Sequence, residues 1–215
     1  MKLAGVDVET TCLDSQKCRI IALAIVPLED NIIRLDRVIY AVNTGVRPSS
    51  SALIHGITPE SEIVKATLDF REALLEASRY LLITYGSHDA KLLAMEASRY
   101  NIQVEYCYSD VMAVLLSLPS YRAYAVEKGR LTLRDALRIT LGITISDIHF
   151  HDPISDAIHA ILIYAHLVKA GIQVPVRCIS SARRRDITKS ITGFFRRFFR
   201  IPSMTRAKRD TAKRA

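Results

Sequence analysis

The sequence predicts an α/β fold in which helices pack over a mixed sheet that is antiparallel at one side. Three observations support this fold class. First, residues 1–45 consist of strand-like runs rich in Val and Ile. Second, the next segments are predicted to form a helix, a strand and a second helix. Third, further helical segments follow these. Because 49% of the 215 residues are hydrophobic, the chain can also bury a substantial core.

Each element has a local signal. Residues 3–8, 19–27 and 32–42 are predicted strands, separated by turn-forming residues at 14–15 and 29–31. The short apolar run 81–85 predicts a buried strand. A final helix is expected to begin at Asp152-Pro153 and to end near Gly171, because Pro is tolerated in a first turn and Gly favours a helix end. The other predicted helices cover residues 59–80, 89–100, 109–118 and 132–141.

Charge divides the chain into two parts. The formal net charge is +8, but residues 1–171 hold 17 Lys and Arg against 20 Asp and Glu, whereas residues 172–215 hold 13 against 2. We therefore expect a domain at 1–171 and a basic extension at 172–215. Within the extension the spacing of Ile and Phe residues among Lys and Arg predicts a basic amphipathic helix, which Pro202 ends before a disordered tail.

The extension has four candidate roles. It can hold a nucleic acid through counterion release, or dock on a polymerase or other protein partner through its phenylalanines. A third role is binding to an anionic membrane surface, which is less favoured, and the fourth is packing of the phenylalanines onto the domain's own core.

Cysteine spacing and the first residues bear on the compartment. The four cysteines form no CxxC pair and no dense pattern, so we expect no disulfide framework and a cytoplasmic protein. The N-terminal residues lack the long apolar segment of a signal peptide. The most apolar stretch, 157–168, is too short to span a bilayer and is expected to form a buried helix.

Carboxylates give the strongest chemical signal. Asp7 and Glu9 end an apolar strand, and residues i and i+2 of a strand lie on one face. Two such carboxylates are either solvated charges at a strand end or ligands of a hard divalent cation. Asp89 follows the predicted strand 81–85, and Asp156 lies in the first turn of the last helix. His151, in the loop before that helix, is a candidate general base.

At these residues the sequence resembles a known family. VDVETTCLD, IHGIT at 54–58, SHDAKLL at 87–93 and HDPISDA at 151–157 are similar, in order and spacing, to the motifs of the DEDDh 3′–5′ exonucleases. The resemblance covers about residues 3–170. The nearest subgroup is similar to the proofreading epsilon subunit of DNA polymerase III and to ribonuclease T. The resemblance implies a ribonuclease-H-like fold, with a mixed five-stranded sheet that is flanked by helices. In this chain the basic C-terminal extension follows that fold.

The resemblance also implies roles for single residues. Asp7, Glu9, Asp89 and Asp156 would bind two Mg²⁺ or Mn²⁺ ions, and His151 would deprotonate the attacking water. Thr10 and His55 would contact the terminal nucleotide. The chain departs from the family pattern at Cys12, where Gly is usual, and at Tyr85 and His88, where Asn and Phe are common. These departures concern contacts to the substrate rather than the five catalytic positions.

Two functions of different classes follow. The first is a metal-dependent exonuclease that hydrolyses single-stranded 3′ ends to nucleoside 5′-monophosphates, with DNA favoured over RNA and with roles in DNA replication, repair and proofreading. The second is a non-catalytic module that binds nucleic acid or a polymerase and retains the exonuclease fold. The intact carboxylates favour the enzyme, because without cations they would repel phosphate.

Overall fold

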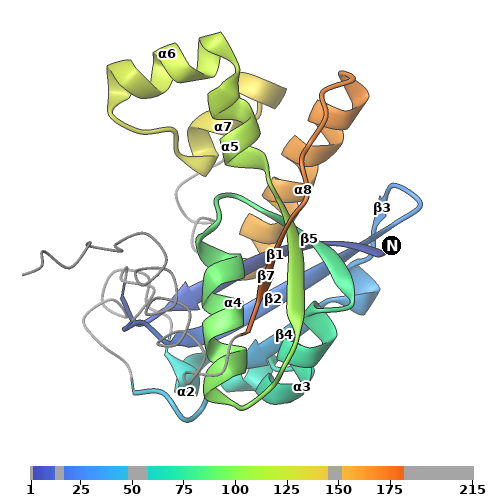
Figure 1. The fold of residues 1–215 in the computed structure, drawn as a ribbon, viewed down its shortest axis with the longest axis vertical. Helices are drawn as coiled ribbons and strands as arrows, with labels where there is room; N and C mark the ends of the chain where they lie inside the picture. Colours follow the sequence, from blue (N-terminus) through green and yellow to red (C-terminus); the bar gives the residue numbers. More distant parts are fainter. Residues whose placement is uncertain (1, 13–16, 48–57, 145–151, 182–215) are drawn as a thin grey trace, which may run out of the picture. The chain divides into compact units, whose positions relative to one another are not determined.

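The protein is described by a computed structural model that covers residues 2–12, 17–47, 58–144 and 152–181 (Figure 1). Within these residues it forms one seven-stranded sheet, in the order β3-β2-β1-β5-β6-β7, with β4 also paired to β2. The strands are β1 (Lys2–Thr10), β2 (Ile20–Glu29), β3 (Ile32–Ile33), β4 (Ile39–Val42), β5 (Tyr80–Thr84), β6 (Glu105–Asp110) and β7 (Arg177–Ser180).

The sheet is mixed, as predicted. Strands β1, β5 and β6 are parallel neighbours, whereas β2, β3, β4 and β7 each pair antiparallel with a neighbouring strand. The β2–β3 turn places Asp30 and Asn31 at positive φ angles of 50° and 63°, which Asn and Asp tolerate better than most residues. Because β1 and β5 run parallel, their C-terminal ends lie at the same edge of the sheet, where parallel α/β sheets commonly bind ligands.

Helices cover both faces of the sheet. On one face, alternate β1 residues Ala4, Val6 and Val8 pack in a core with α3 (Phe70–Ala77) and α4 (His88–Arg99). On the other face, a second core joins the sheet to α5 (Val111–Ser117), α7 (Leu133–Leu141) and α8 (Pro153–Lys169). Three short elements and a peripheral helix complete the described elements: η1 (Leu35–Arg37), α2 (Pro59–Glu62), η2 (Ile63–Lys65) and α6 (Pro119–Lys128).

Gly5 allows α8 to lie directly on β1. A Cβ atom at this position would stand 2.4 Å from the carbonyl oxygen of Ala157 and 2.8 Å from the side chain of Ile161. Only a residue without a side chain fits such a close approach. Because residues i, i+2 and i+4 of a strand share a face, Asp7 and Glu9 lie on the same face as α8.

The fold class is confirmed, and the differences lie in individual elements. The sheet has seven strands rather than five in the part of the chain that is described, because β6 and β7 extend it on the β5 side. The predicted helix 59–80 is divided, since Asp69 begins α3 by accepting hydrogen bonds from the backbone N–H groups of Arg71 and Glu72. The predicted strand 32–42 is interrupted by η1. Strand β7 lies beyond Gly171, in the segment assigned to the basic extension.

The expectation of no disulfides is wrong. Cys12 bonds to Cys18, and Cys107 bonds to Cys178. The first pair closes a six-residue separation between β1 and β2, and the second joins directly opposed residues of β6 and β7 that are 71 positions apart in sequence. The cysteine spacing therefore does not indicate a reducing compartment.

The apolar stretch 157–168 lies within α8, and buried residues on this helix contact the sheet. Among the described helices none is both long and apolar enough to cross a membrane. The predicted amphipathic helix of the basic extension lies outside the described residues.

Candidate active site

The first two carboxylates lie where β1 ends. Asp7 and Glu9 pair with Ala24 and Ala22 of β2, whose small side chains leave room on the α8 face of the sheet. The pairing shifts by one residue between Glu9 and Thr10. Such irregularities bend a strand and redirect its side chains, and they are frequent beside active sites.

The third carboxylate follows β5. Asp89 lies in the first turn of α4 and is 9% exposed. The turn into this helix needs Gly86, whose φ angle is 104°, a conformation that L side chains rarely adopt. The N–H of Gly86 donates to Oδ1 of Asp110 at 3.1 Å, and the same oxygen caps α5 by accepting from the N–H of Ala113 at 3.0 Å. Asp110 thus fixes the turn that places Asp89.

The fourth carboxylate lies at the start of α8. Asp152 is the helix N-cap, as predicted, and its Oδ2 accepts hydrogen bonds from the N–H and the hydroxyl of Ser155 at 3.2 and 2.8 Å. This cap fixes the first turn, which contains Asp156. Nδ1 of His159, one turn further along, lies 3.5 Å from Oδ1 of Asp156.

Electrostatics shows that these carboxylates form one cluster. Burial raises the pKa of Asp7 well above its usual value, and the charges of Asp89, Asp156 and Glu9 raise it further. Burial, followed by the charges of Asp156 and Asp89, raises the pKa of Glu9 to about 8. The pKa of Asp89 is likewise raised to about 8, by burial and by the charges of Asp110 and Asp156. The sequence-predicted carboxylates of β1, α4 and α8 are therefore brought together.

The donor set fits divalent cations. Each influence on the pKa of Asp7 and Glu9 raises it, so these two carboxylates carry a charge at neutral pH only at an energetic cost. A cation with hard oxygen preference, such as Mg²⁺ or Mn²⁺, would remove that cost and satisfy the oxygens. The residues that would hold such ions are Asp7, Glu9, Asp89 and Asp156.

A pH dependence of stability follows from these pKa values. Glu9 and Asp89 titrate near pH 8 in the folded protein, compared with about 4 in an unfolded chain. Between these values the folded state binds more protons than the unfolded state, so the free energy of unfolding falls as pH rises. We expect the metal-free protein to melt at a lower temperature near ~pH 8 than near ~pH 6.

Thermal unfolding in EDTA and in Mn²⁺ checks this expectation. Mn²⁺ should raise the melting temperature more at the higher pH, because it competes with protons for the carboxylates. The Glu9→Gln variant is the control, since it should show a weaker fall of stability with pH. An equal pH dependence in the variant would contradict the raised pKa of Glu9.

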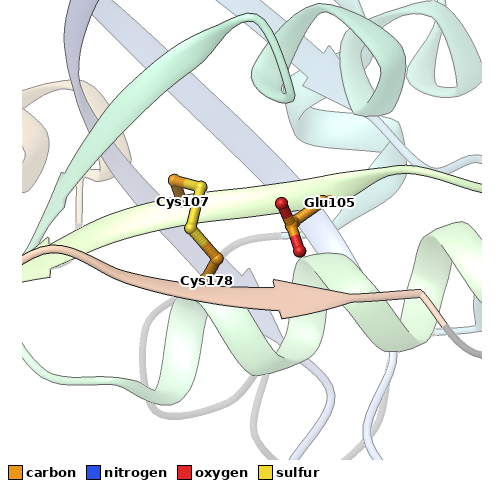
Figure 2. A group of neighbouring side chains, drawn as sticks. All are labelled: Glu105, Cys107 and Cys178. Carbon is orange, nitrogen blue, oxygen red and sulfur yellow. A yellow bond between two sulfur atoms is a disulfide. The ribbon is translucent and has the colours of Figure 1, made fainter.

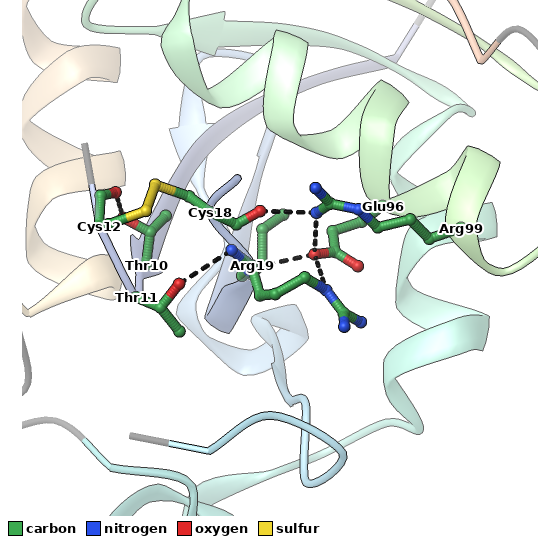
Figure 3. The surroundings of a disulfide bond; sticks show 8 residues. Thr10, Thr11, Cys12, Cys18, Arg19, Glu96 and Arg99 are labelled. Carbon is green, nitrogen blue, oxygen red and sulfur yellow. Dashed lines mark hydrogen bonds and ion pairs between the residues drawn. A yellow bond between two sulfur atoms is a disulfide. The ribbon is translucent and has the colours of Figure 1, made fainter. Parts of the chain in front are cut away.

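A covalent and ionic clamp holds the segment that follows β1 (Figure 3). The hydroxyl of Thr10 donates to the carbonyl of Cys12 at 2.8 Å, and Cys12 is bonded to Cys18. The fully buried Glu96 of α4 accepts from Nε of Arg19 at 2.7 Å and from the Arg99 guanidinium at 2.8 Å. Arg99 also donates to the carbonyl of Cys18 at 2.6 Å. The departure from the family pattern at Cys12 therefore ties the end of the DxE motif to β2 and α4.

The departure at Tyr85 also has a structural explanation. Its hydroxyl oxygen lies 2.9 Å from each of the backbone carbonyl oxygens of Leu131 and Thr132, which share its one O–H donor. Tyr85 thus links the end of β5 to the start of α7. His88 is half-buried at the first position of α4, and burial lowers the pKa of its imidazole.

Two predicted site residues, His55 and His151, lie outside the described residues. Thr10 is described at the end of β1. Tyr40 and Glu62 lie near the cluster but were not predicted from the sequence. The hydroxyl of Tyr40 donates to the carboxylate of Glu62 in a buried hydrogen bond of 2.5 Å. The charge of Glu62 contributes to the raised pKa of Glu9. The sequence around these two residues shows only a strand-like pattern at Tyr40 and an acidic first turn at Glu62, and neither pattern is specific to a functional site.

Comparisons with known proteins bear on the family and the fold of the chain. The family model "RNase_T: Exonuclease" matches residues 5–164, about three quarters of the chain. No curated protein matches the sequence significantly.

Similar folds occur among solved nucleases. A 3′-exonuclease that recognises the 3′ end of a histone mRNA stem-loop has a TM-score of 0.62 and 16% identity, over 84% of this chain and 90% of the other. The nuclease domain of 3′hExo, a DEDDh family member bound to rAMP, has a TM-score of 0.58 and 16% identity, over 82% and 96%. Exonuclease I of E. coli in complex with a dT13 oligonucleotide has a TM-score of 0.57 and 17% identity, over 89% of this chain and 43% of the other.

Proposed function

Because the chain belongs to the DEDDh family of 3′–5′ exonucleases, we propose that it hydrolyses single-stranded 3′ ends, with DNA as the favoured substrate, to nucleoside 5′-monophosphates. The observation that supports this proposal is the cluster of Asp7, Glu9, Asp89 and Asp156, in which burial and the charges of neighbouring carboxylates raise the pKa values of Asp7, Glu9 and Asp89. A module that only binds nucleic acid has no use for such a cluster, since it repels phosphate unless cations are present.

The four carboxylates would bind two Mg²⁺ or Mn²⁺ ions. Such a pair supplies positive charge that stabilises the attacking and the leaving oxygen of a phosphodiester. Asp7 and Glu9 would hold their side of the site from the rigid end of β1, Asp89 from α4 and Asp156 from α8. The clustering of these groups would allow both ions to be held at once.

The proton of the attacking water would pass to His151, which directly precedes the α8 cap Asp152 in sequence. An imidazole titrates near neutral pH and can accept this proton. Thr10 and His55 would contact the terminal nucleotide. Replacing His151 by Gln should lower the rate at saturating substrate without reducing Mn²⁺ binding.

DNA and RNA are distinguished by a direct comparison. We expect 5′-labelled single-stranded oligonucleotides of both kinds to be shortened from the 3′ end, with DNA degraded faster. A faster reaction on RNA would overturn the substrate preference while leaving the nuclease itself intact. Roles in DNA replication, repair and proofreading are part of the proposal only if DNA is preferred.

For the basic extension we propose tethering of the nucleic-acid substrate, with docking on a polymerase or other protein partner as the second candidate. Of its 13 Lys and Arg residues, 12 follow Ala182, and β7 ends at Ser180. Truncation after residue 182 therefore keeps the sheet and removes most of the positive charge. A membrane surface is the least favoured partner.

The truncated protein should bind single-stranded DNA more weakly, and its affinity should depend less steeply on salt, because fewer counterions are released. The measurement is the binding constant of a catalytically inactive Asp7→Asn protein at several salt concentrations, with and without residues 183–215. An unchanged salt dependence would exclude tethering and favour docking on a protein.

A further inference from the structure

A second cluster of metal-ligating side chains lies at the far edge of the sheet from β1. Figure 2 shows Cys107 on β6 bonded to Cys178 on β7, with the carboxylate of Glu105 beside them. Cys107 and Cys178 are directly opposite each other, with Cα atoms 4.0 Å apart. Glu105 is two residues before Cys107 and so shares its face of the strand. One potential ligand atom from each residue lies within 4.8 Å of the others.

We propose that Glu105, Cys107 and Cys178, once the disulfide is reduced, form a binding site for Zn²⁺ or another thiophilic divalent cation. This site is separate from the carboxylate cluster and does not depend on the nuclease reaction.

The ligand set suits zinc. Two thiolates and one carboxylate are ligand types that zinc takes in proteins, with about 2.3 Å to sulfur and about 2.0–2.2 Å to oxygen. Tetrahedral bonds of that length separate two ligand sulfurs by about 3.8 Å, which neighbouring strands can provide without moving their backbones. Three ligands leave the fourth position to water, and the hydroxyl of Ser180, which donates to Glu105 at 3.3 Å, can orient the carboxylate.

The position makes the site accessible. Strand β7 pairs with β6 and with no other described strand, and Glu105 and Cys178 are exposed while Cys107 is half-buried. A reductant and a metal ion can therefore both reach the sulfurs. In a reducing compartment the two cysteines would be thiols.

The two states of the site exclude each other. An external dithiol gives two electrons and two protons to the Cys107–Cys178 bond and closes its own disulfide, which leaves two thiols on the protein. Zn²⁺ then displaces both thiol protons to solvent and forms two bonds to sulfur. The disulfide and the metal both cross-link β7 to β6, whereas the reduced, metal-free state leaves β7 held by its backbone pairing and side-chain packing alone.

Cadmium titration of the reduced protein tests the site, because Cd²⁺ bound to thiolates has an ultraviolet charge-transfer band that carboxylate sites lack. The Cys12→Ser, Cys18→Ser double variant removes the other thiols. We expect the band to saturate at one thiolate-bound Cd²⁺ per chain in the reduced variant, to be lost when Zn²⁺ is added, and to be absent from the oxidised protein, whatever Cd²⁺ the carboxylate cluster binds. Zn²⁺ should also raise the melting temperature of the reduced variant more than that of the same variant carrying Cys178→Ser, which keeps only the carboxylate cluster.

Substitutions assign the ligands. Cys178→Ser should abolish the band, and Glu105→Gln should weaken Cd²⁺ binding roughly tenfold or more, whereas Glu72→Gln on the exposed surface of α3 should have no effect. If the double variant does not fold, reduced wild type is compared with the Cys107→Ser, Cys178→Ser protein. Absence of a band that depends on Cys107 and Cys178 would overturn the proposal, and an unchanged affinity in Glu105→Gln would overturn the role of Glu105.

Discussion

Replacing Asp7 by Asn is expected to lower the rate of 3′-end digestion by about a thousandfold or more. Asn keeps the size of the side chain but removes the charge that would bind both cations. Because burial and four neighbouring carboxylates raise the pKa of Asp7, the substitution should also raise the melting temperature of the metal-free protein. A loss of activity together with a gain of stability is not expected of a residue that only supports the fold.

The measurement is the digestion rate of a 5′-labelled oligonucleotide, with thermal unfolding in EDTA alongside. Asp36→Asn is the matched control, since Asp36 is exposed and paired with Arg34 at 2.8 Å, far along the chain from the carboxylate cluster. The control should digest at the wild-type rate. Full activity in Asp7→Asn would remove Asp7 from the site even if the protein is a nuclease.

Replacing Gly5 by Ala is expected to produce the largest loss of stability from a single added methyl group. The new Cβ would stand 2.4 Å from a backbone oxygen of α8, and a backbone atom cannot turn aside as a flexible side chain can. Overpacking of this kind costs about 2 kcal/mol or more, which corresponds to a fall in melting temperature of about 4–8 °C for a domain of this size. Because α8 carries Asp156, digestion should slow as well.

Gly45→Ala is the control for this effect. A Cβ at position 45 would meet only the side-chain oxygen of Asn43 at 3.5 Å, an ordinary contact, so its melting temperature should stay close to that of wild type. A Gly5→Ala protein as stable as the control would show that α8 does not pack on β1 as closely as described.

Much of the carboxylate cluster could be predicted from local sequence. The alternation of β1 places Asp7 and Glu9 on one face, and the signal Asp152-Pro153 places the start of α8 and thus Asp156. These predictions succeed because a strand period and a helix cap depend on residues close together in the chain.

Other features depend on contacts between distant segments. Strand β6 alternates buried Tyr106 with the more exposed Glu105 and Cys107, but no strand was predicted there, and the predicted helix 109–118 includes the last two residues of β6. The pairing of Cys107 with Cys178 requires the register of β6 and β7, which nothing near either cysteine indicates. The close approach at Gly5 likewise depends on where α8 packs.

The central claim is that the carboxylate cluster supports metal-dependent removal of nucleotides from a 3′ end. It is tested most directly by incubating the protein with a 5′-labelled single-stranded DNA in Mg²⁺, in Mn²⁺ and in EDTA, and by following the product lengths over time. We predict a ladder that shortens one nucleotide at a time from the 3′ end with either metal and an intact oligonucleotide in EDTA. Release of the labelled 5′ nucleotide first, or equal digestion in EDTA, would contradict the account.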